Sequence, residues 1–281
     1  MKKIIRMRWK PYTAVVLHPR LANYRRFNAM QFSLALMKQK KLEEKQLIIA
    51  LCKEHTMRKR PVYDWSFNSK IAIIAEVKKA SPSKGIIKIV DPAEQAVHYQ
   101  QAGAKAISVL TDSHYFGGSF DDLCHVANVV TLPVLCKEFI CYPEQIDAAY
   151  LCGADSVLLI NAMLTASELQ MLYDYAIAKH LTPLIEIHAL SELDTVLTLK
   201  PQYIMVNMRT LNTMEIDYKT GTEALQAIPS SVIKICASSI DSPHLLRHIK
   251  EKTGATIFLV GTALMQAENP QTFLQELFNV C

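Results

Sequence analysis

Short apolar runs and longer amphipathic segments alternate along most of this 281-residue chain. The runs have the length of buried strands and are rich in Ile, Val, Leu and Ala, which is typical of strands covered on both faces. They begin near Ile71, Ala106, Pro133, Ser156, Pro183, Tyr203, Val232 and Thr256. Neighbouring runs start between 20 and 35 residues apart, which leaves room for one strand and one helix. The pattern therefore predicts an α/β protein built from repeated strand–helix units.

The segments between the runs carry signals for helix starts and ends. The start signals are Asp91-Pro92, Ser119, Tyr142-Pro143, Thr165, Ser191, Ser242-Pro243 and Asn269-Pro270, and the terminating glycines are Gly103, Gly153 and Gly254. Eight such units predict a closed (β/α)8 TIM barrel. An open doubly wound sheet is the alternative, but it normally has a glycine-rich turn after its first strand, and Glu76–Ser83 is not one.

A different pattern precedes the first run. Between Phe32 and Glu54, apolar positions at helical spacing predict one or two amphipathic helices. The positions expected on the apolar face are Leu34, Met37, Lys41, Leu42, Leu47, Ile48 and Leu51. We therefore expect a single barrel domain over residues 31–281 that includes extra N-terminal helices.

The charge of the chain is unevenly distributed. Residues 1–42 hold eleven of the 31 Lys and Arg and no acidic residue, which leaves 20 basic against 26 acidic residues, a net charge of −6, for the rest. An acidic body argues against binding of nucleic acid. Residues 1–30 are predicted to form a basic, poorly ordered extension without a catalytic role. A targeting peptide, or upstream sequence translated from a start before Met30, remains the alternative.

Two further features concern the compartment. No uncharged apolar run reaches about 18 residues, so no membrane span is predicted. The seven cysteines are odd in number and form no C-x-x-C pair. They predict a reducing, cytoplasmic environment with free buried thiols, rather than a disulfide framework or a zinc site.

Polar residues stand at the ends of the apolar runs, where a barrel of this kind holds its chemistry. Glu76 and Lys78 end the first run and point to the same side of a strand, because they are two residues apart. Later runs end in Thr111, Asp112, Lys137, Asn161, Glu186, His188, Asn207 and Arg209. One such pair has an ordinary explanation as an ion pair at the rim, but several converging ones are costly unless they are paired or used. They predict an acid–base site.

The last two runs end in small residues, Ser238-Ser239 and Gly261-Thr262. Backbone N–H groups at a helix start after Gly261 would suit an anion, and strands 7 and 8 of such barrels often hold phosphate. Tight packing at the rim is the other interpretation. We predict a phosphate site here.

Several longer stretches resemble one known family. They are E-V-K-K-A-S-P-S-K-G (Glu76–Gly85), I-S-V-L-T-D-x-H-Y-F-G-G-S (Ile107–Ser119), P-V-L-C-K-E-F-I (Pro133–Ile140), G-A-D-S-V-L-L-I (Gly153–Ile160), I-E-I-H (Ile185–His188), V-N-M-R-T-L (Val206–Leu211) and F-L-V-G-T-A-L-M (Phe258–Met265). In this order they resemble indole-3-glycerol phosphate synthase of tryptophan biosynthesis, from about Phe67 to Pro270.

The resemblance implies a carboxy-lyase that uses no metal or organic cofactor. Its substrate would be 1-(2-carboxyphenylamino)-1-deoxyribulose 5-phosphate, closed with loss of carbon dioxide and water to indole-3-glycerol phosphate. Lys137 would be the general acid at the ribulose carbonyl, and Glu186 would assist the loss of water as a base. Lys78 would contact the substrate carboxylate, Glu76 would orient the lysines, and Asn207 would hold substrate hydroxyls.

The resemblance also implies a binding pocket. The anthranilate ring would lie against Ser81, Phe116 and Phe139, and the phosphate would be surrounded by Arg209, Ser238, Ser239, Gly261 and Thr262. The expected partners are this phosphorylated small molecule and other enzymes of the tryptophan pathway, with no nucleic acid and no membrane. A monomer or weak dimer is expected.

The chain departs from the family pattern after the seventh run. Ala237 replaces the usual glutamate and Ser239 the usual glycine, and Met205 stands where glycine is common. A catalytically impaired or re-specialised paralogue that binds a related sugar phosphate is therefore the alternative function. A phosphoribosylanthranilate isomerase would need a Cys/Asp pair at the strand ends, which the E-x-K-x-x-S-P-S pattern does not supply.

Overall fold

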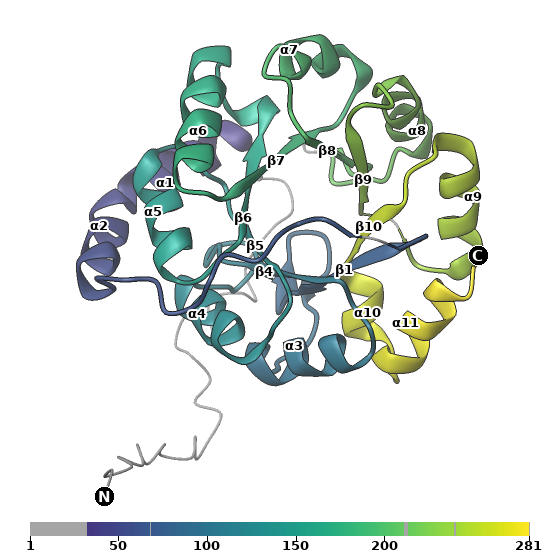
Figure 1. The fold of residues 1–281 in the computed structure, drawn as a ribbon, viewed down its shortest axis with the longest axis horizontal. Helices are drawn as coiled ribbons and strands as arrows, with labels where there is room; N and C mark the ends of the chain where they lie inside the picture. The colour runs from purple at the N-terminus through teal and green to yellow at the C-terminus, as the bar shows by residue number, and fades with distance from the viewer. Residues whose placement is uncertain (1–32, 68, 211–212, 239, 281) are drawn as a thin grey trace, which may run out of the picture.

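The computed structural model describes residues 33–67, 69–210, 213–238 and 240–280, so the predicted extension over residues 1–30 lies outside the described residues. Eight parallel strands close into a barrel in the order β1-β10-β9-β8-β7-β6-β5-β4 (Figure 1). They are β1 (Ala72–Val77), β4 (Ala106–Leu110), β5 (Val134–Lys137), β6 (Ser156–Ile160), β7 (Thr182–Ile187), β8 (Tyr203–Asn207), β9 (Ile233–Ala237) and β10 (Ile257–Val260). The barrel closes where β10 pairs with β1. The predicted (β/α)8 fold is confirmed.

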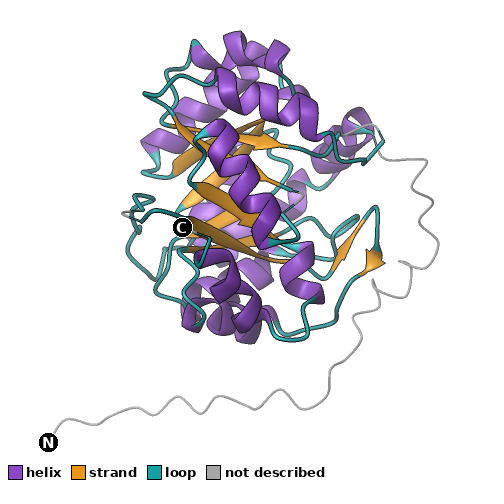
Figure 2. Cartoon of the chain, turned by 90° about the vertical axis from the view of Figure 1, so that its right-hand side faces the viewer, coloured by secondary structure: helices purple, strands orange, loops and turns teal. Residues whose placement is uncertain are grey.

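Helices cover the outside of this barrel, which Figure 2 shows from the side. The helices that follow the barrel strands are α3 (Pro92–Gln101), α4 (Phe120–Val129), α5 (Pro143–Leu151), α6 (Ala166–Ala178), α7 (Leu193–Leu197), α8 (Tyr218–Ala227), α9 (Pro243–Thr253), α10 (Thr262–Gln266) and α11 (Pro270–Phe278). Five predicted caps accept backbone N–H groups of the first turn, namely Asp91, Ser119, Thr165, Ser242 and Asn269. No helix among the described residues is long and apolar enough to span a bilayer.

The helix predicted after Ser191 starts differently. A 3₁₀ turn (Leu190–Glu192) precedes α7, and Ala189 is the residue before that turn. The Glu192 side chain accepts the backbone N–H groups of His188 and Ala189 at 2.7 and 3.1 Å. The prediction of Ser191 as the helix cap is therefore wrong, because Glu192 satisfies the preceding donors instead.

The leading segment forms two helices, α1 (Leu34–Glu43) and α2 (Lys45–Glu54), which lie outside the barrel beside α5 (Figure 1). Met37, Lys41 and Ile48 are buried, as expected for the inner face. Leu42 and Leu47, which were expected on the same face, are 50% and 66% exposed. The chain turns at the junction of the two helices, so a single helical stripe does not continue through it.

Two local features were not anticipated. The polar segment after β1 contains a small antiparallel ribbon of β2 (Ala80–Ser81) and β3 (Gly85–Ile86). Cys124 of α4 and Cys152 at the end of α5 form a disulfide, whereas Cys52, Cys136, Cys141 and Cys236 are free. The prediction of free thiols is therefore wrong for this pair. Packing of α4 against α5 brings together two cysteines that are 28 residues apart in the sequence.

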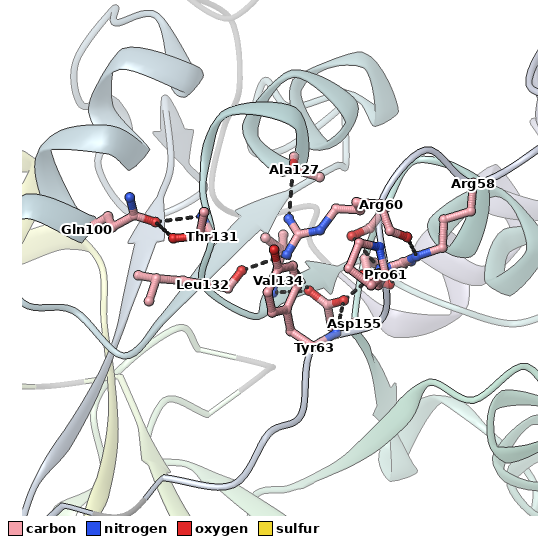
Figure 3. Close-up of polar contacts among 12 residues, drawn as sticks. Arg58, Arg60, Pro61, Tyr63, Gln100, Ala127, Thr131, Leu132, Val134 and Asp155 are labelled. Atoms are coloured by element: carbon pink, nitrogen blue, oxygen red, sulfur yellow. Dashed lines mark hydrogen bonds and ion pairs between the residues drawn. The ribbon is translucent and has the colours of Figure 1, made fainter.

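A buried carboxylate ties the segment after α2 to the barrel (Figure 3). Asp155, which is fully buried just before β6, contacts Arg58 at 2.6 Å and Arg60 at 3.2 Å. Its oxygens also accept the backbone N–H groups of Tyr63 at 2.9 Å and Val134 at 2.8 Å. Because Asp155 precedes its strand, this arrangement lies at the end of the barrel opposite the carboxyl ends of the strands.

An Asp155→Asn substitution is expected to destabilise the fold by about 3–5 kcal/mol, because it leaves two mostly buried guanidinium groups without their anion. Activity per folded molecule should stay within about twofold of the wild type, since the change lies far from the strand ends. Urea unfolding followed by circular dichroism would measure the first quantity. The matched control is Asp174→Asn on the exposed face of α6. Equal unfolding midpoints for the two variants would contradict this role for Asp155.

Candidate active site

A cavity of roughly 330 Å³ opens at the carboxyl ends of the strands. Of the residues that the sequence predicts for the site, those that line it are Glu76, Lys78, Ser81, Phe116, Lys137, Phe139, Glu186, Asn207, Arg209, Ser238, Gly261 and Thr262. Four other polar residues that end the apolar runs do not line it, namely Thr111, Asp112, Asn161 and His188. Ser239 lies outside the described residues. The fold therefore brings these side chains from separate strand ends to one mouth.

Two lysines and two glutamates face one another in this cavity. Lys78 Nζ lies 2.8 Å from Glu76 Oε1 and so forms a close ion pair. Lys137 Nζ lies 4.0 Å from Glu76 Oε2 and 3.8 Å from Glu186 Oε2, distances longer than a hydrogen bond. Both carboxylates are buried, at 4% and 1% exposure. The Lys137 ammonium is thus attracted by two anions while its protons can still be donated to a bound molecule.

The environment of Glu186 keeps it ionised. Burial alone would raise the pKa of this carboxyl, but Lys137, followed by His188 and the Asn207 amide, outweighs that effect and lowers the pKa to about 2. His188 Nε2 lies 3.3 Å from Glu186 Oε1, and Asn207 Nδ2 donates to the same oxygen at 3.2 Å. An ionised carboxylate beside a proton donor can act as a base.

From the sequence, His188 was predicted only to stand at a strand end, without a contact partner. It stands two residues after Glu186, so both side chains lie on the same side of β7 and its continuation. That spacing was the available signal. The structure adds that its ring nitrogen reaches the carboxylate, whereas His188 does not line the cavity itself.

Asn207 links the ends of β8 and β9. Its Oδ1 accepts the Ser238 hydroxyl at 2.6 Å and the backbone N–H of Arg209 at 3.1 Å. Ser238 has a left-handed backbone with φ of 65°, which is uncommon for a residue with a side chain. The chain thus takes this conformation at Ser238, whereas Ser239, which replaces the family's usual glycine, lies outside the described residues.

Gly261 is required by the space that Glu76 occupies. A Cβ atom at this position would overlap Glu76 Oε1 and lie 3.1 Å from Lys78 Nζ. Its φ is −124°, so lack of space and not backbone strain selects glycine here. The carboxyl end of β10 thus leaves room for the Glu76–Lys78 pair.

A Gly261→Ala variant is therefore expected to displace the Glu76 carboxylate and to lower kcat/KM by roughly tenfold to a hundredfold, because small misplacements of reacting groups are costly. Steady-state kinetics of the purified variant would measure this loss. Gly254→Ala lies before β10 and strains a backbone with φ of 71° without meeting another atom, so it controls for a loss of stability that leaves Glu76 in place. Kinetics equal to the wild type in Gly261→Ala would contradict the steric argument.

One group among the described residues has the chemistry and spacing of a metal site. The ligand atoms of His55, Cys124 and Cys152 lie within 4.8 Å of one another. None of the three lines the cavity at the strand ends, and the two sulfurs are bonded to each other.

The fold and the mouth together define a (β/α)8-barrel protein with an acid–base pocket at the carboxyl ends of its strands. The family model described as "Indole-3-glycerol phosphate synthase" matches residues 33–277. The chain belongs to the indole-3-glycerol phosphate synthase family.

Individual relatives agree with this assignment. An indole-3-glycerol phosphate synthase of Crocosphaera subtropica is 42% identical over 74% of this chain and 73% of the relative. That of Oceanobacillus iheyensis is 38% identical over 84% and 94%. A multifunctional tryptophan biosynthesis protein of Schizosaccharomyces pombe is 42% identical over 78% of this chain and 29% of its own length. Among solved structures, a 3-hexulose-6-phosphate synthase aligns with a TM-score of 0.59 at 14% identity, over 75% of this chain and 99% of that one, which shows the fold alone.

Proposed function

We propose that this chain catalyses the synthesis of indole-3-glycerol phosphate. The substrate, 1-(2-carboxyphenylamino)-1-deoxyribulose 5-phosphate, would lose one carbon dioxide and one water as its five-membered ring closes. The observation that carries the proposal is the position of the Lys137 ammonium between the Glu76 and Glu186 carboxylates. Ring closure needs an acid at an oxygen, and the later loss of water needs a base, so this group of charges supplies both.

In the first step, the ring carbon that bears the carboxylate attacks the ribulose carbonyl carbon. Lys137 donates a proton to the carbonyl oxygen as the new carbon–carbon bond forms. Loss of carbon dioxide then leaves its bonding electrons in the ring and restores aromaticity. Lys78 holds the departing carboxylate, and Glu76 fixes Lys78 through the 2.8 Å contact. Preorganised cations around a developing alkoxide lower the barrier.

In the second step, the alcohol formed above takes a proton from the Lys78 ammonium and leaves as water, and the pyrrole double bond forms. Glu186 accepts the proton that the neighbouring carbon or nitrogen releases, and its ionised state at neutral pH suits this role. Asn207 holds the substrate hydroxyls, since its amide already lies beside Glu186. Both steps proceed without oxidation or reduction, so the proposed chemistry calls for no redox cofactor.

The substrate ends occupy two sides of the cavity. The anthranilate ring lies near Phe116 and Phe139, whose ring centroids are 6.1 Å apart, with Ser81 beside them. The phosphate lies at the opposite side, against a set of small and cationic residues. These are Arg209, Ser238, Ser239, Gly261 and Thr262.

The direct test is turnover of this substrate by the purified chain, followed by the fluorescence of the indole product. Product formation at a rate proportional to enzyme concentration is the expected result. The second candidate function is a barrel that binds a related sugar phosphate without this reaction. Ala237 favours it, because this residue lines the cavity and replaces the glutamate that is usual in the family. Binding of the substrate without any turnover would select this second function and overturn the first.

The remaining proposals concern the setting of the enzyme. We propose action in the cytoplasm, as a monomer or weak dimer, with contacts to other enzymes of the tryptophan pathway. The fused Schizosaccharomyces pombe relative supports such contacts, because its name describes several activities of tryptophan biosynthesis in one chain. Sedimentation velocity at micromolar concentration would measure the oligomeric state.

A further inference from the structure

A second charged cluster lies beside the mouth, where Lys41 of α1 meets the residues that follow β4 and β5. Lys41 of α1 is only 2% exposed. Its ammonium lies 2.7 Å from Asp112 Oδ1, 3.0 Å from Glu138 Oε1 and 3.1 Å from Glu44 Oε2. Asp112 and Glu138 are themselves buried. A leading helix thus supplies a cation that two buried carboxylates of the barrel share.

Each of these two carboxylates also holds part of a strand-end loop. Glu138 accepts the backbone N–H of Phe139 at 2.7 Å through one oxygen and the Thr111 hydroxyl at 2.7 Å through the other. Asp112 accepts the backbone N–H of Tyr115 at 2.6 Å. The Lys41 ammonium therefore joins the loop after β4 to the loop after β5.

These loops carry groups on which the proposed reaction depends. Glu138 directly follows Lys137, the proposed acid, so a fixed Glu138 limits the directions that the Lys137 side chain can take. Phe139 follows in turn, and Phe116 directly follows the anchored residue of the other loop. The two phenylalanine rings form one side of the cavity. The positions of the proposed acid and of the proposed ring pocket thus both depend on the Lys41 ammonium.

The charges explain why this ammonium is needed. Burial raises the pKa of Glu138, Lys41 opposes that rise, and Asp112 adds to it. Without Lys41, two buried carboxylates would face each other, and one would bind a proton or both would move apart. Either change alters the hydrogen bonds that hold the two loops.

We propose that Lys41 is a positioning residue of the active site, which acts through Asp112 and Glu138 to hold Lys137 and the ring pocket in place. This inference rests on the proposed function for its kinetic consequences, whereas the contacts themselves are independent of it. The leading helix α1 then helps to position the active site, in addition to covering the outside of the barrel.

The test compares Lys41→Met with Lys38→Met. Lys38 stands on the same helix but pairs with Glu168 at the surface. Lys41→Met is expected to lower kcat/KM by about tenfold to a hundredfold, with a lower kcat and a higher KM, because both the acid and the ring pocket shift. Lys38→Met should stay within about twofold. Hydrogen exchange by mass spectrometry should show faster exchange over residues 111–118 and 137–142 in Lys41→Met alone.

The outcomes separate a positioning role from a structural one. Lower stability of Lys41→Met, with wild-type kcat and KM and unchanged exchange in both loops, would overturn the proposal. If Lys41→Met does not fold, Glu138→Gln takes its place, since it keeps the volume and is expected to show the same two effects. If the wild type itself shows no turnover, the proposed function fails separately. The exchange measurement then decides the role of Lys41 alone: faster loop exchange supports it, and unchanged exchange overturns it.

Discussion

A Lys137→Met variant is expected to lose at least about a thousandfold in kcat while keeping the barrel fold. Methionine preserves the length and apolar stem of the side chain but removes the proton donor. General acid catalysis contributes roughly 10²–10⁴-fold, and loss of a preorganised cation adds to it. Initial rates of indole fluorescence at saturating substrate would measure kcat, and circular dichroism would verify the fold.

The matched control is Lys88→Met, an exposed lysine in the segment after β3 that does not line the cavity. It should retain wild-type kcat. A Lys137→Met variant with more than about a tenth of the wild-type kcat would contradict the assignment of the acid, because no single general acid of this kind is worth so little.

A Glu186→Gln variant is expected to lower kcat by about 10²–10⁴-fold, with a small change in KM, because glutamine keeps the shape but cannot accept the proton. The proposed role places this loss in the dehydration step. A pre-steady-state experiment with substrate in excess should therefore release carbon dioxide in a burst close to one per enzyme, with slow indole formation afterwards. Glu94→Gln on the exposed face of α3 is the control. Equal slowing of both products without a burst would place Glu186 at an earlier step.

The pH dependence follows from the same carboxylate. Its folded pKa, about 2, lies below the ordinary 4.5. Its contribution to stability is therefore present above about pH 4.5 and is lost as the pH falls through about 2. Because this pKa lies well below pH 5, protonation of Glu186 in the free enzyme should not limit kcat/KM between pH 5 and 8. Removal of Lys137 raises the pKa of Glu186. As the solution is acidified, any residual activity of Lys137→Met should therefore be lost at a higher pH than that of the wild type.

The barrel could be predicted from the sequence because the signals for its strands and helices lie within short segments of the chain. Each strand is a short apolar run, and most helices start with a capping side chain that bonds to its own first turn, as Thr165 does with Glu168. The residues of the candidate site were found for a related reason. Glu76, Lys137 and Glu186 interrupt apolar runs where burial of a charge is costly, so their positions are conspicuous in the sequence.

Other features depend on contacts between distant segments, and the sequence pattern did not reveal them. Lys41 fitted the inner face of a predicted helix, but nothing in its neighbours indicated that Asp112 and Glu138 would meet its ammonium. The disulfide likewise joins residues of two different helices. Such pairings follow from how the helices pack on the barrel, and side chains far apart in the chain leave no periodic signal.

The sequence by itself determined the class of fold, the strand ends that carry charge, and the family to which the chain is similar. Tertiary structure alone decided the distances among those charges, since they depend on the closure of the barrel and the register of its strands. The closure puts Lys137 between two glutamates from opposite parts of the barrel. It also puts Gly261 against Glu76, so that the absence of one Cβ leaves room for the carboxylate. The types of the reacting side chains can be read from the sequence, whereas the distances between them are set only when the barrel closes.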